Sequence, residues 1–410
     1  MLTAMLVVGA SGKLYAAADT DVPQVSLLTV EPGPVIYELD GHTALRFSLP
    51  GRYDYIVNWG VFDFNSPNFL YRFVKGETDY MAWPFPSEMF LEEYRRQGRG
   101  VTEQIIDLTP AQARRLEAMV TDNLRPENRT YRYNYIYDNC ATRPLALIEK
   151  AIGAPVSIAG TPGFVYGETG IADDGAPTTF RKEMSHTHAD YPWYQFGIDL
   201  ALGSGIDYRI DIRRTAFAPV VLQALAASAE IYSGPEAKLV PLVSSTTVLV
   251  DGPEEGPVEG PTPWILSPMA VALLILLVAL GLCLMDLRRR KVSRWFDALL
   301  FGLYGLAGCV ITFLIVISVH EATSPNILIF WLNPLLLLVP ALIWFRRMRV
   351  VVFAVMGLSL AATLTCALCL LCGVQDYNSS FMPLMAASAI RALNYLIINR
   401  DVVRKTVSKV

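Results

Sequence analysis

One cysteine of this chain of 410 residues, Cys140, lies outside its apolar C-terminal third. The other five occupy long apolar runs, where cysteine is most often a small buried hydrophobic residue: Cys283, Cys309, Cys366, Cys369 and Cys372. Cys140 therefore has no disulfide partner in the more polar part of the chain. Such a thiol is either buried and inert or a nucleophile, and a nucleophile needs a base and a group that favours the thiolate.

His42 is the best candidate for that base. Three histidines precede the apolar third, namely His42, His186 and His188. Alternating residues from Val35 to Phe47 predict a strand, Pro50-Gly51 predicts a turn, and Tyr53 to Trp59 predicts a second strand, so the two should form a hairpin. His42 then lies on the first strand and Asn58 on the second, where its amide could orient the imidazole. Asp54 and Asp63 are alternatives for that orienting role.

The segment around Cys140 predicts that the thiol lies at the start of a helix. A tyrosine-rich strand is predicted from Thr130 to Tyr137, and Gly153 is a typical helix end. Pro144 is tolerated only in the first turn of a helix, so the helix must begin within a few residues of Cys140. The partial positive charge of the helix N-terminus and a His42 imidazolium would both lower the thiol pKa. The neighbouring Asn139 and Asp138 are candidates for orienting the site or for its oxyanion side.

The apolar third predicts a membrane domain. Five segments approach the roughly 20 residues that a spanning helix needs: residues 264–285, 296–319, 327–345, 350–372 and 381–398. Basic clusters follow the first, third and fifth segments, whereas the loops around His320-Glu321 and Gln375-Asp376 contain no Lys or Arg. The positive-inside rule therefore places these two loops, and the whole chain before the first span, away from the cytoplasm. A lone thiol in that oxidising compartment requires a reason, and nucleophilic chemistry is the commonest one.

These patterns divide the chain into five parts: a signal-like segment 1–19, an exported domain 20–232 closed by a helix from Pro219 to about Ile231, a Pro/Gly/Glu-rich linker 233–263, membrane helices 264–399 and a basic cytoplasmic tail 400–410. No basic residue precedes the apolar run of the first segment. Either the start is misplaced or the segment is an uncleaved anchor. The net charge of −4 is too small to predict a nucleic-acid partner.

An aromatic-rich stretch from Phe62 to Phe85 has two interpretations. Aromatic residues at this density are usually core, but they could also line an apolar groove for a lipid chain.

The order of a Gly-His strand and a later Asn-Cys helix start resembles the circularly permuted papain-like enzymes related to lecithin:retinol acyltransferase. More closely, four motifs resemble the Lnb family of bacterial lipoprotein N-acyltransferases: residues 41–46 (GHTALR), 58–64 (NWGVFDF), 137–143 (YDNCATR) and 196–200 (FGIDL). The resemblance implies an α+β fold, with a circularly permuted papain-like exported domain followed by an all-α membrane domain of five transmembrane helices. It also implies the cell inner membrane, with the N-terminal domain in the periplasm and the C-terminus in the cytoplasm.

The same resemblance implies transfer of a fatty acyl chain to the α-amino group of the lipid-modified N-terminal cysteine of lipoproteins. Cys140 would attack a membrane phospholipid, His42 would move the proton, and a thioester would form. The partners are then the phospholipid, the lipoprotein N-terminus and the bilayer, and no cofactor is needed. The candidates for contacts with substrate are Trp59, Arg143, His320 and Asn326. Simple placement at the membrane surface is the alternative for the last two.

Two other patterns could bind metal, but both lack further ligands. Cys366, Cys369 and Cys372 have a metal-like spacing inside a predicted span, and His186-Thr187-His188 could place two imidazoles on one strand face or lie in a loop. We therefore predict no metal site. Arg391, in the fifth span, is either functional or extends to the cytoplasmic surface.

Two other functions agree with the sequence. The same Cys-His pair could serve an envelope hydrolase, either a cell-wall peptidase or amidase or a phospholipase. Alternatively, the chain could be a noncatalytic envelope membrane protein, in which His42 and Cys140 lie apart.

Overall fold

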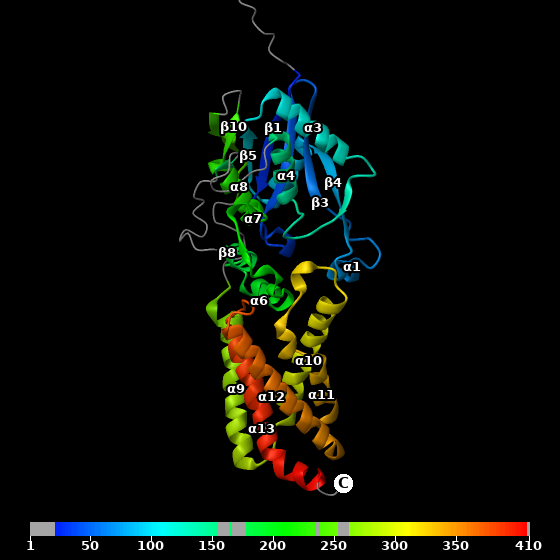
Figure 1. Cartoon of the computed structure of the whole chain (residues 1–410), viewed down its shortest axis with the longest axis vertical. Coiled ribbons are helices and arrows are strands. Elements are labelled where there is room, and N and C mark those ends of the chain that lie inside the picture. Colours follow the sequence, from blue (N-terminus) through cyan, green and yellow to red (C-terminus); the bar gives the residue numbers. More distant parts are fainter. Residues whose placement is uncertain (1–20, 154–163, 166–177, 234–237, 253–261, 408–410) are drawn as a thin grey trace, which may run out of the picture.

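The computed structural model describes residues 21–153, 164–165, 178–233, 238–252 and 262–407. An α+β domain occupies one end of the molecule and a bundle of apolar helices the other (Figure 1). The signal-like segment 1–19 and part of the expected linker and tail lie outside the described residues.

An antiparallel sheet organises the N-terminal domain. In the described part of the chain it has seven strands in the order β12-β5-β1-β2-β3-β4-β6. Their bounds are β1 Gln24–Val30, β2 His42–Leu49, β3 Tyr53–Val61, β4 Asp79–Pro86, β5 Val101–Ile106, β6 Thr130–Arg132 and β12 Val243–Val250. The predicted hairpin is confirmed as β2 and β3, in which Ala44 lies opposite Asn58. Its first strand begins at His42 and not at Val35, because Ile36–Glu38 form a 3₁₀ turn. Because side chains alternate along a strand, His42 and Asn58 extend from the same face of the sheet.

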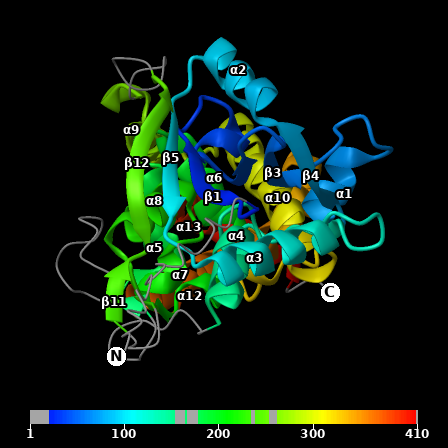
Figure 2. The ribbon, with the colours of Figure 1, turned by 90° about the horizontal axis from the view of Figure 1, so that it is seen from above.

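Helices cover both faces of this sheet, as Figure 2 shows for α2 (Ser87–Gln97) on one side and α3 (Pro110–Asn123) on the other. On the α3 side, α4 (Thr142–Ile152) and α8 (Pro219–Ser228) complete the main core with Leu45, Val57 and Trp59. On the α2 side, Phe90 packs against Ala44 and Ile56. The remaining elements of the domain are α1 Phe69–Lys75, β7 Phe164–Val165, β8 Thr178–Thr179, α5 Phe180–Thr187, α6 Pro192–Ala201, β9 Arg209–Ile210, α7 Ile212–Thr215, β10 Glu230–Ser233 and β11 Lys238–Pro241.

The following predictions about this domain are corrected. The helix that begins at Pro219 ends at Ser228, and the chain then forms β10, β11 and β12. Because β12 pairs with β5 at the sheet edge, the folded domain extends to Val250 and the linker begins later than residue 233. The strand predicted for Thr130 to Tyr137 ends at Arg132, and beyond it Asn134 and Asp138 close a tight turn through paired backbone hydrogen bonds. Residues 186–188 occupy the end of α5 instead of a strand or loop.

The C-terminal part has four described helices that are long and apolar enough to cross a membrane. They are α9 Pro268–Arg289, α10 Arg294–Val316, α12 Arg349–Leu371 and α13 Phe381–Val407. The third predicted span is not one helix: 3₁₀ turns at Ile327–Phe330 and Pro334–Leu337 lead into the short α11, Leu338–Leu342. Pro334 and Pro340 have no backbone N–H, so neither can donate the hydrogen bond that a continuous helix would need at its position. This segment packs closely on α10, where a Cβ on Gly308 would lie 2.6 Å from the Asn333 backbone.

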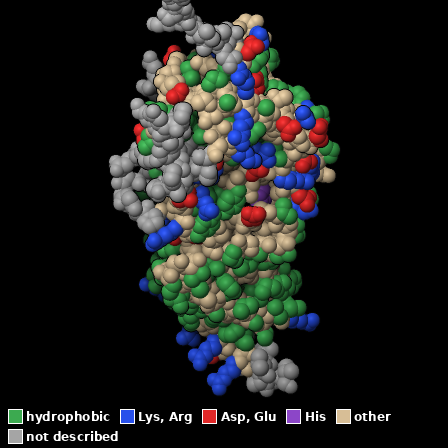
Figure 3. Space-filling model, turned by 45° about the horizontal axis from the view of Figure 1, so that its top comes forward, with side chains coloured by type: hydrophobic (Ala, Val, Ile, Leu, Met, Phe, Trp, Pro, Cys, Tyr) green, Lys and Arg blue, Asp and Glu red, His purple; other side chains and the backbone are tan. Residues whose placement is uncertain are grey.

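The ends of the bundle differ in charge. Figure 3 shows hydrophobic side chains across the visible face of the bundle, with Lys and Arg side chains gathered at the end far from the N-terminal domain. The loop with His320 lies at the near end, beside α1 (Figure 1). This arrangement agrees with the orientation predicted from the basic residues.

Hydrogen bonds connect α1 to the loop that follows α10. The Val319 N–H donates to the Lys75 carbonyl at 2.8 Å, and the Ser318 hydroxyl donates to the Val74 carbonyl at 3.0 Å. These bonds satisfy carbonyls at the C-terminal end of α1, which have no partner within the helix. The loop of the membrane domain therefore holds α1 at the surface of the bundle.

Arg391 does not extend to the cytoplasmic surface. Its guanidinium is fully buried and donates to Asp286 at 2.8 Å and to Asp297 at 2.6 Å. The group joins α9, α10 and α13 inside the bundle, which corrects the surface interpretation.

Candidate active site

A tight turn and a helix start hold Cys140 in place. Asn139 accepts hydrogen bonds from the backbone N–H groups of Ala141 (2.8 Å) and Thr142 (2.9 Å), while its amide nitrogen donates to the Tyr135 and Phe217 carbonyls. The helix α4 begins at Thr142, so the predicted position of the thiol just before a helix is confirmed. Asn139 thus fixes the backbone on both sides of Cys140.

Cys140 and His42 line the same cavity, which has a volume of about 480 Å³. The Nε2 atom of His42 lies 2.8 Å from the Asn58 Oδ1 atom. Because an amide oxygen only accepts hydrogen bonds, a neutral His42 carries its proton on Nε2 and keeps a lone pair on Nδ1. The ring is therefore oriented with one nitrogen available to accept a proton.

The imidazole of His42 is neutral at pH 7. Burial lowers its pKa to about 4, and the positive charge of Arg99 acts in the same direction, against the hydrogen bond to Asn58. A neutral imidazole can act as a general base from its ground state.

The Cys140 thiol is protonated in the resting protein. Burial raises its pKa, as does the negative charge of Asp40. Hydrogen bonds from the Thr43 backbone N–H and the Tyr133 hydroxyl, whose oxygen is 4.0 Å from the sulfur, oppose this shift only in part. The predicted net lowering of the resting thiol pKa is therefore wrong, although backbone N–H groups, including that of Cys140 itself, do act in the lowering direction. The resting site therefore combines a protonated thiol with a neutral imidazole on the wall of one cavity.

The alternatives to Asn58 have other partners. Asp54 forms an ion pair with Arg46 and accepts a hydrogen bond from Ser87. Asp63 accepts a hydrogen bond from the backbone of Asn65 on an exposed turn. Asn58 is the one of the three that bonds to His42.

Asp138 and Arg143 form a clamp beside the site. Their side chains make an ion pair, and the guanidinium lies 3.5 Å from the centre of the Tyr131 ring. The described residues that line the Cys140 cavity include neither of them. The pair therefore lies outside this cavity, although Asp138 lines the second pocket described below.

The other three substrate-binding candidates lie in different surroundings. Trp59 forms part of the cavity wall and donates from Nε1 to the Asn123 side chain at 2.8 Å. His320 reaches the cavity from the membrane domain and bonds from Nε2 to the Phe73 carbonyl at 3.0 Å. Asn326 is buried away from the cavity wall and bonds to the Leu200 carbonyl and the Leu328 N–H.

The aromatic stretch forms much of the cavity wall. Phe62, Phe64, Phe69 and Phe73 all line the cavity, and Phe64 and Phe73 are also about half exposed on the outside. Phe62 contacts Phe64 and Phe69 with ring centres 4.5 Å and 5.6 Å apart. Of the two interpretations of this stretch, the apolar groove agrees with the structure.

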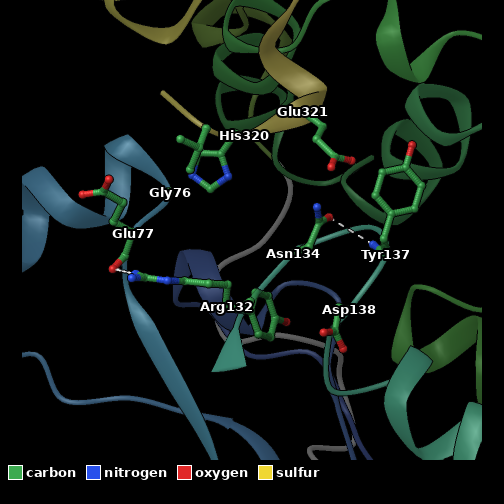
Figure 4. A pocket seen from close by; sticks show the side chains of 10 residues that line it. Gly76, Glu77, Arg132, Asn134, Tyr137, Asp138, His320 and Glu321 are labelled. Atoms are coloured by element: carbon green, nitrogen blue, oxygen red, sulfur yellow. Dashed lines mark hydrogen bonds between the residues drawn. The ribbon is translucent and has the colours of Figure 1, made fainter. Parts of the chain in front are cut away.

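A second, polar pocket of about 580 Å³ adjoins the first (Figure 4). Its lining includes charged side chains from three segments, namely Glu77, Arg132, Asp138 and Glu321. Gly76, Tyr133 and His320 line both pockets. These three residues therefore separate the apolar cavity from the polar pocket.

The sequence interpretation missed Asp40, Tyr133 and Tyr135, which also line the cavity. Asp40 precedes Gly41, whose φ of +78° and close approach to the Val30 carbonyl exclude a side chain there. Asp40 lies two residues before the candidate base His42 in the sequence, and this closeness could have identified it as a residue of the site. The two tyrosines lay in a segment interpreted as a strand.

No metal site is evident in the described part of the chain, where no three His, Cys, Asp or Glu residues converge. His188 is buried and its Nδ1 atom lies 2.8 Å from Gln195 Oε1. The three cysteines of α12 and its end are free thiols, and that of Cys366 donates to the Ile327 carbonyl.

Two family models match the chain in succession. Residues 12–166 match the Lnb N-terminal periplasmic domain, and residues 261–401 match the Lnb transmembrane domain. No curated protein and no solved structure matches. With both domains of one family present in order, the chain is a multi-pass membrane protein with a periplasmic N-terminal domain and belongs to the Lnb family, a family of lipoprotein N-acyltransferases.

Proposed function

We propose that this protein moves a fatty acyl chain from a membrane phospholipid, through a Cys140 thioester, to the α-amino group of the lipid-modified N-terminal cysteine of lipoproteins. The observation that carries this proposal is that Cys140 and a neutral, oriented His42 share an apolar cavity that His320 reaches from the membrane domain. The exported domain is then a circularly permuted papain-like enzyme, anchored in the cell inner membrane with its C-terminus in the cytoplasm.

In the first half-reaction, the Cys140 sulfur attacks the ester carbonyl as His42 Nδ1 accepts the thiol proton. Negative charge develops on the carbonyl oxygen, where the Tyr133 hydroxyl and the Thr43 N–H are available as donors. Burial raises the pKa of Tyr133 well above its usual value, so this hydroxyl keeps its proton. Collapse of the intermediate breaks the ester C–O bond, and His42 returns the proton to the departing lysophospholipid oxygen.

In the second half-reaction, the unprotonated amine of the acceptor attacks the thioester carbonyl. His42 takes a proton from the nitrogen of the intermediate and gives it to the sulfur as the C–S bond breaks. The products are an amide and the free thiol. An apolar cavity that excludes water favours this aminolysis over hydrolysis.

The cavity lies next to the membrane bundle, where both the phospholipid donor and the lipid-modified acceptor would be found. The helix α1 contributes Phe69, Leu70 and Phe73 to the cavity wall, and its end is bonded to the loop after α10. Leu70 is 73% exposed and Tyr71 contacts Phe313 of α10. A donor acyl chain could therefore pass from the bilayer into the cavity past α1.

The alternatives fit less well. A cell-wall peptidase or amidase needs neither an apolar cavity nor a contact between that cavity and a membrane bundle. A noncatalytic protein would leave His42 and Cys140 apart, whereas here they line one cavity. A phospholipase shares the first half-reaction and differs in using water as the acceptor.

Mass spectrometry of lipoprotein N-terminal peptides tests the proposal. Cells that depend on this protein for N-acylation should lose the triacylated peptide when they carry Cys140→Ala. The matched control is Cys372→Ala, which removes an exposed thiol at the end of α12. Unchanged triacylation with Cys140→Ala would refute the proposal, and release of free fatty acid without peptide acylation would favour the phospholipase.

A further inference from the structure

A buried carboxylate shares the cavity with the nucleophile. Asp40 lines the cavity and accepts a hydrogen bond from the Tyr135 hydroxyl. Its other oxygen, Oδ1, lies 3.3 Å from His188 Nε2. Both of these atoms are shielded from solvent, and neither makes a well-formed hydrogen bond within the described part of the chain. Asp40 and His188 thus face each other without a complete hydrogen bond between them.

The hydrogen bonds around His188 indicate where the protons lie between His188 Nε2 and Asp40 Oδ1. Gln195 Nε2 donates to Asp199 Oδ1 at 3.0 Å, so Gln195 Oε1 must accept the hydrogen bond from His188 Nδ1. That bond uses the single proton of a neutral imidazole. With Nε2 bare, the gap between it and Asp40 Oδ1 has room for one more proton; with Nε2 protonated, His188 forms an ion pair with Asp40.

The negative charge of Asp40 disfavours formation of the thiolate. Burial raises the Asp40 pKa, but a protonated His188 at 3.3 Å and hydrogen bonds from Tyr135 and Thr187 outweigh it, and the net pKa is lowered. The carboxylate is therefore an anion, and its charge raises the Cys140 pKa. Burying a charge costs free energy, and this one disfavours the Cys140 thiolate. The buried Asp40 carboxylate therefore needs a role other than activation of the thiol.

The other charged groups on the cavity wall are already matched. Arg99 lies 3.2 Å from Glu38 and also donates to the Glu31 carbonyl. Tyr135 and Tyr194, the polar neighbours on the remaining sides, are held neutral because burial raises their pKa. Asp40 is thus an anion that could accept a cation from a substrate.

We propose that Asp40, backed by His188, binds the ammonium group of the acceptor and takes its first proton. This inference rests on the proposed function, in which an α-amine with a pKa near 8 must become neutral before it attacks. The ammonium N–H bond breaks, the proton moves to the Asp40–His188 pair and then to solvent, and the free amine attacks the thioester carbonyl. The second nitrogen proton goes through His42 to the sulfur, so that atoms and charges balance.

The test separates the two half-reactions in the full-length protein reconstituted in phosphatidylethanolamine-containing vesicles. The first is followed by the intact mass of the Cys140 acyl-enzyme without acceptor. The second is followed by transfer to a diacylglyceryl-cysteine peptide. We expect Asp40→Asn to form the acyl-enzyme fully but to lose about tenfold or more of its transfer rate at pH 7, since one pKa unit corresponds to tenfold.

The pH profile and the choice of nucleophile distinguish this role from a structural one. The transfer rate of Asp40→Asn should rise about tenfold per pH unit below pH 8, as the free amine fraction rises, whereas the wild-type rate should rise less. Hydroxylamine, which is uncharged at neutral pH, should discharge the wild-type and Asp40→Asn acyl-enzymes equally. The variant His188→Gln keeps a donor for Gln195 and should show the same selective loss, so it replaces Asp40→Asn if that variant does not fold.

Equal losses in both half-reactions, or wild-type transfer by Asp40→Asn at pH 7, would overturn the role of Asp40. Failure of the wild-type protein to form an acyl-enzyme would instead refute the proposed function itself.

Discussion

The ring of His42 and the amide of Asn58 are joined across two neighbouring strands, with Nε2 and Oδ1 2.8 Å apart. Asn58 lies opposite Ala44, and His42 extends from the same face two residues earlier on β2. The register of one hairpin therefore decides which imidazole nitrogen is left to accept a proton in the cavity.

Asn58→Ala should slow formation of the acyl-enzyme about fivefold, because one hydrogen bond contributes roughly 1 kcal/mol and that amount corresponds to about fivefold in rate. The loss should appear in kcat, since Asn58 orients the base and does not contact the substrate. Burst kinetics of lysophospholipid release would measure it. Asn65→Ala, in an exposed turn, is the matched control. An unchanged burst rate in Asn58→Ala would show that the ring needs no such orientation.

The acylation rate should remain high down to about pH 5 and fall as the pH decreases through about 4. The reason is that the lowered pKa of His42, about 4, keeps the base neutral above that pH. The same shift affects stability: the unfolded protein binds a proton below its ordinary pKa of 6.5 while the folded protein resists it, so stability falls between these two pH values on acidification. Initial rates and melting temperatures from pH 4 to 8 would check both. A midpoint of the rate near pH 6.5 would contradict a neutral buried base.

Alkylation of Cys140 by iodoacetamide should be slow at pH 7 and should still be increasing above pH 9. Burial and the charge of Asp40 raise the thiol pKa above its ordinary value, so little thiolate exists at neutral pH. Peptide mass spectrometry would follow the modification, with exposed Cys372 as an internal reference. A half-titration point below pH 7 would indicate a resting thiolate–imidazolium pair instead.

Local patterns predicted the parts of this site that neighbours in sequence determine. Strand alternation and a turn gave the hairpin with His42 and Asn58, and Pro144 placed a helix start beside Cys140. The contact between Asp40 and His188 joins residues 148 positions apart through the packing of α5 against the turn before β2. No local pattern encodes such a contact. The return of β12 to the sheet edge and the broken third span likewise depend on what each segment packs against.

Leu70→Glu should weaken activity on phospholipid in vesicles and leave activity on a soluble short-chain ester nearly unchanged. Leu70 is 73% exposed on α1 beside the bundle, and removing a leucine side chain from lipid costs about 1.5–3 kcal/mol, or about tenfold to a hundredfold in apparent KM. Met89→Glu, at a 62% exposed position on α2, is the matched control. Equal losses on both esters would show that α1 does not contact the bilayer.

Arg391→Leu should destabilise the bundle without a selective effect on chemistry. The substitution leaves Asp286 and Asp297 buried without the cation that joins them, and breaking a buried ion pair from one side costs about 3–5 kcal/mol. Adding Asp286→Asn and Asp297→Asn should recover part of this loss, because the uncompensated charges disappear with their partner. Thermal unfolding in detergent measures the stability, and activity per folded molecule measures the chemistry. If Arg391→Leu instead kept its melting temperature and lost activity, the guanidinium would serve the reaction, and the structural role inferred from its two buried carboxylates would be wrong.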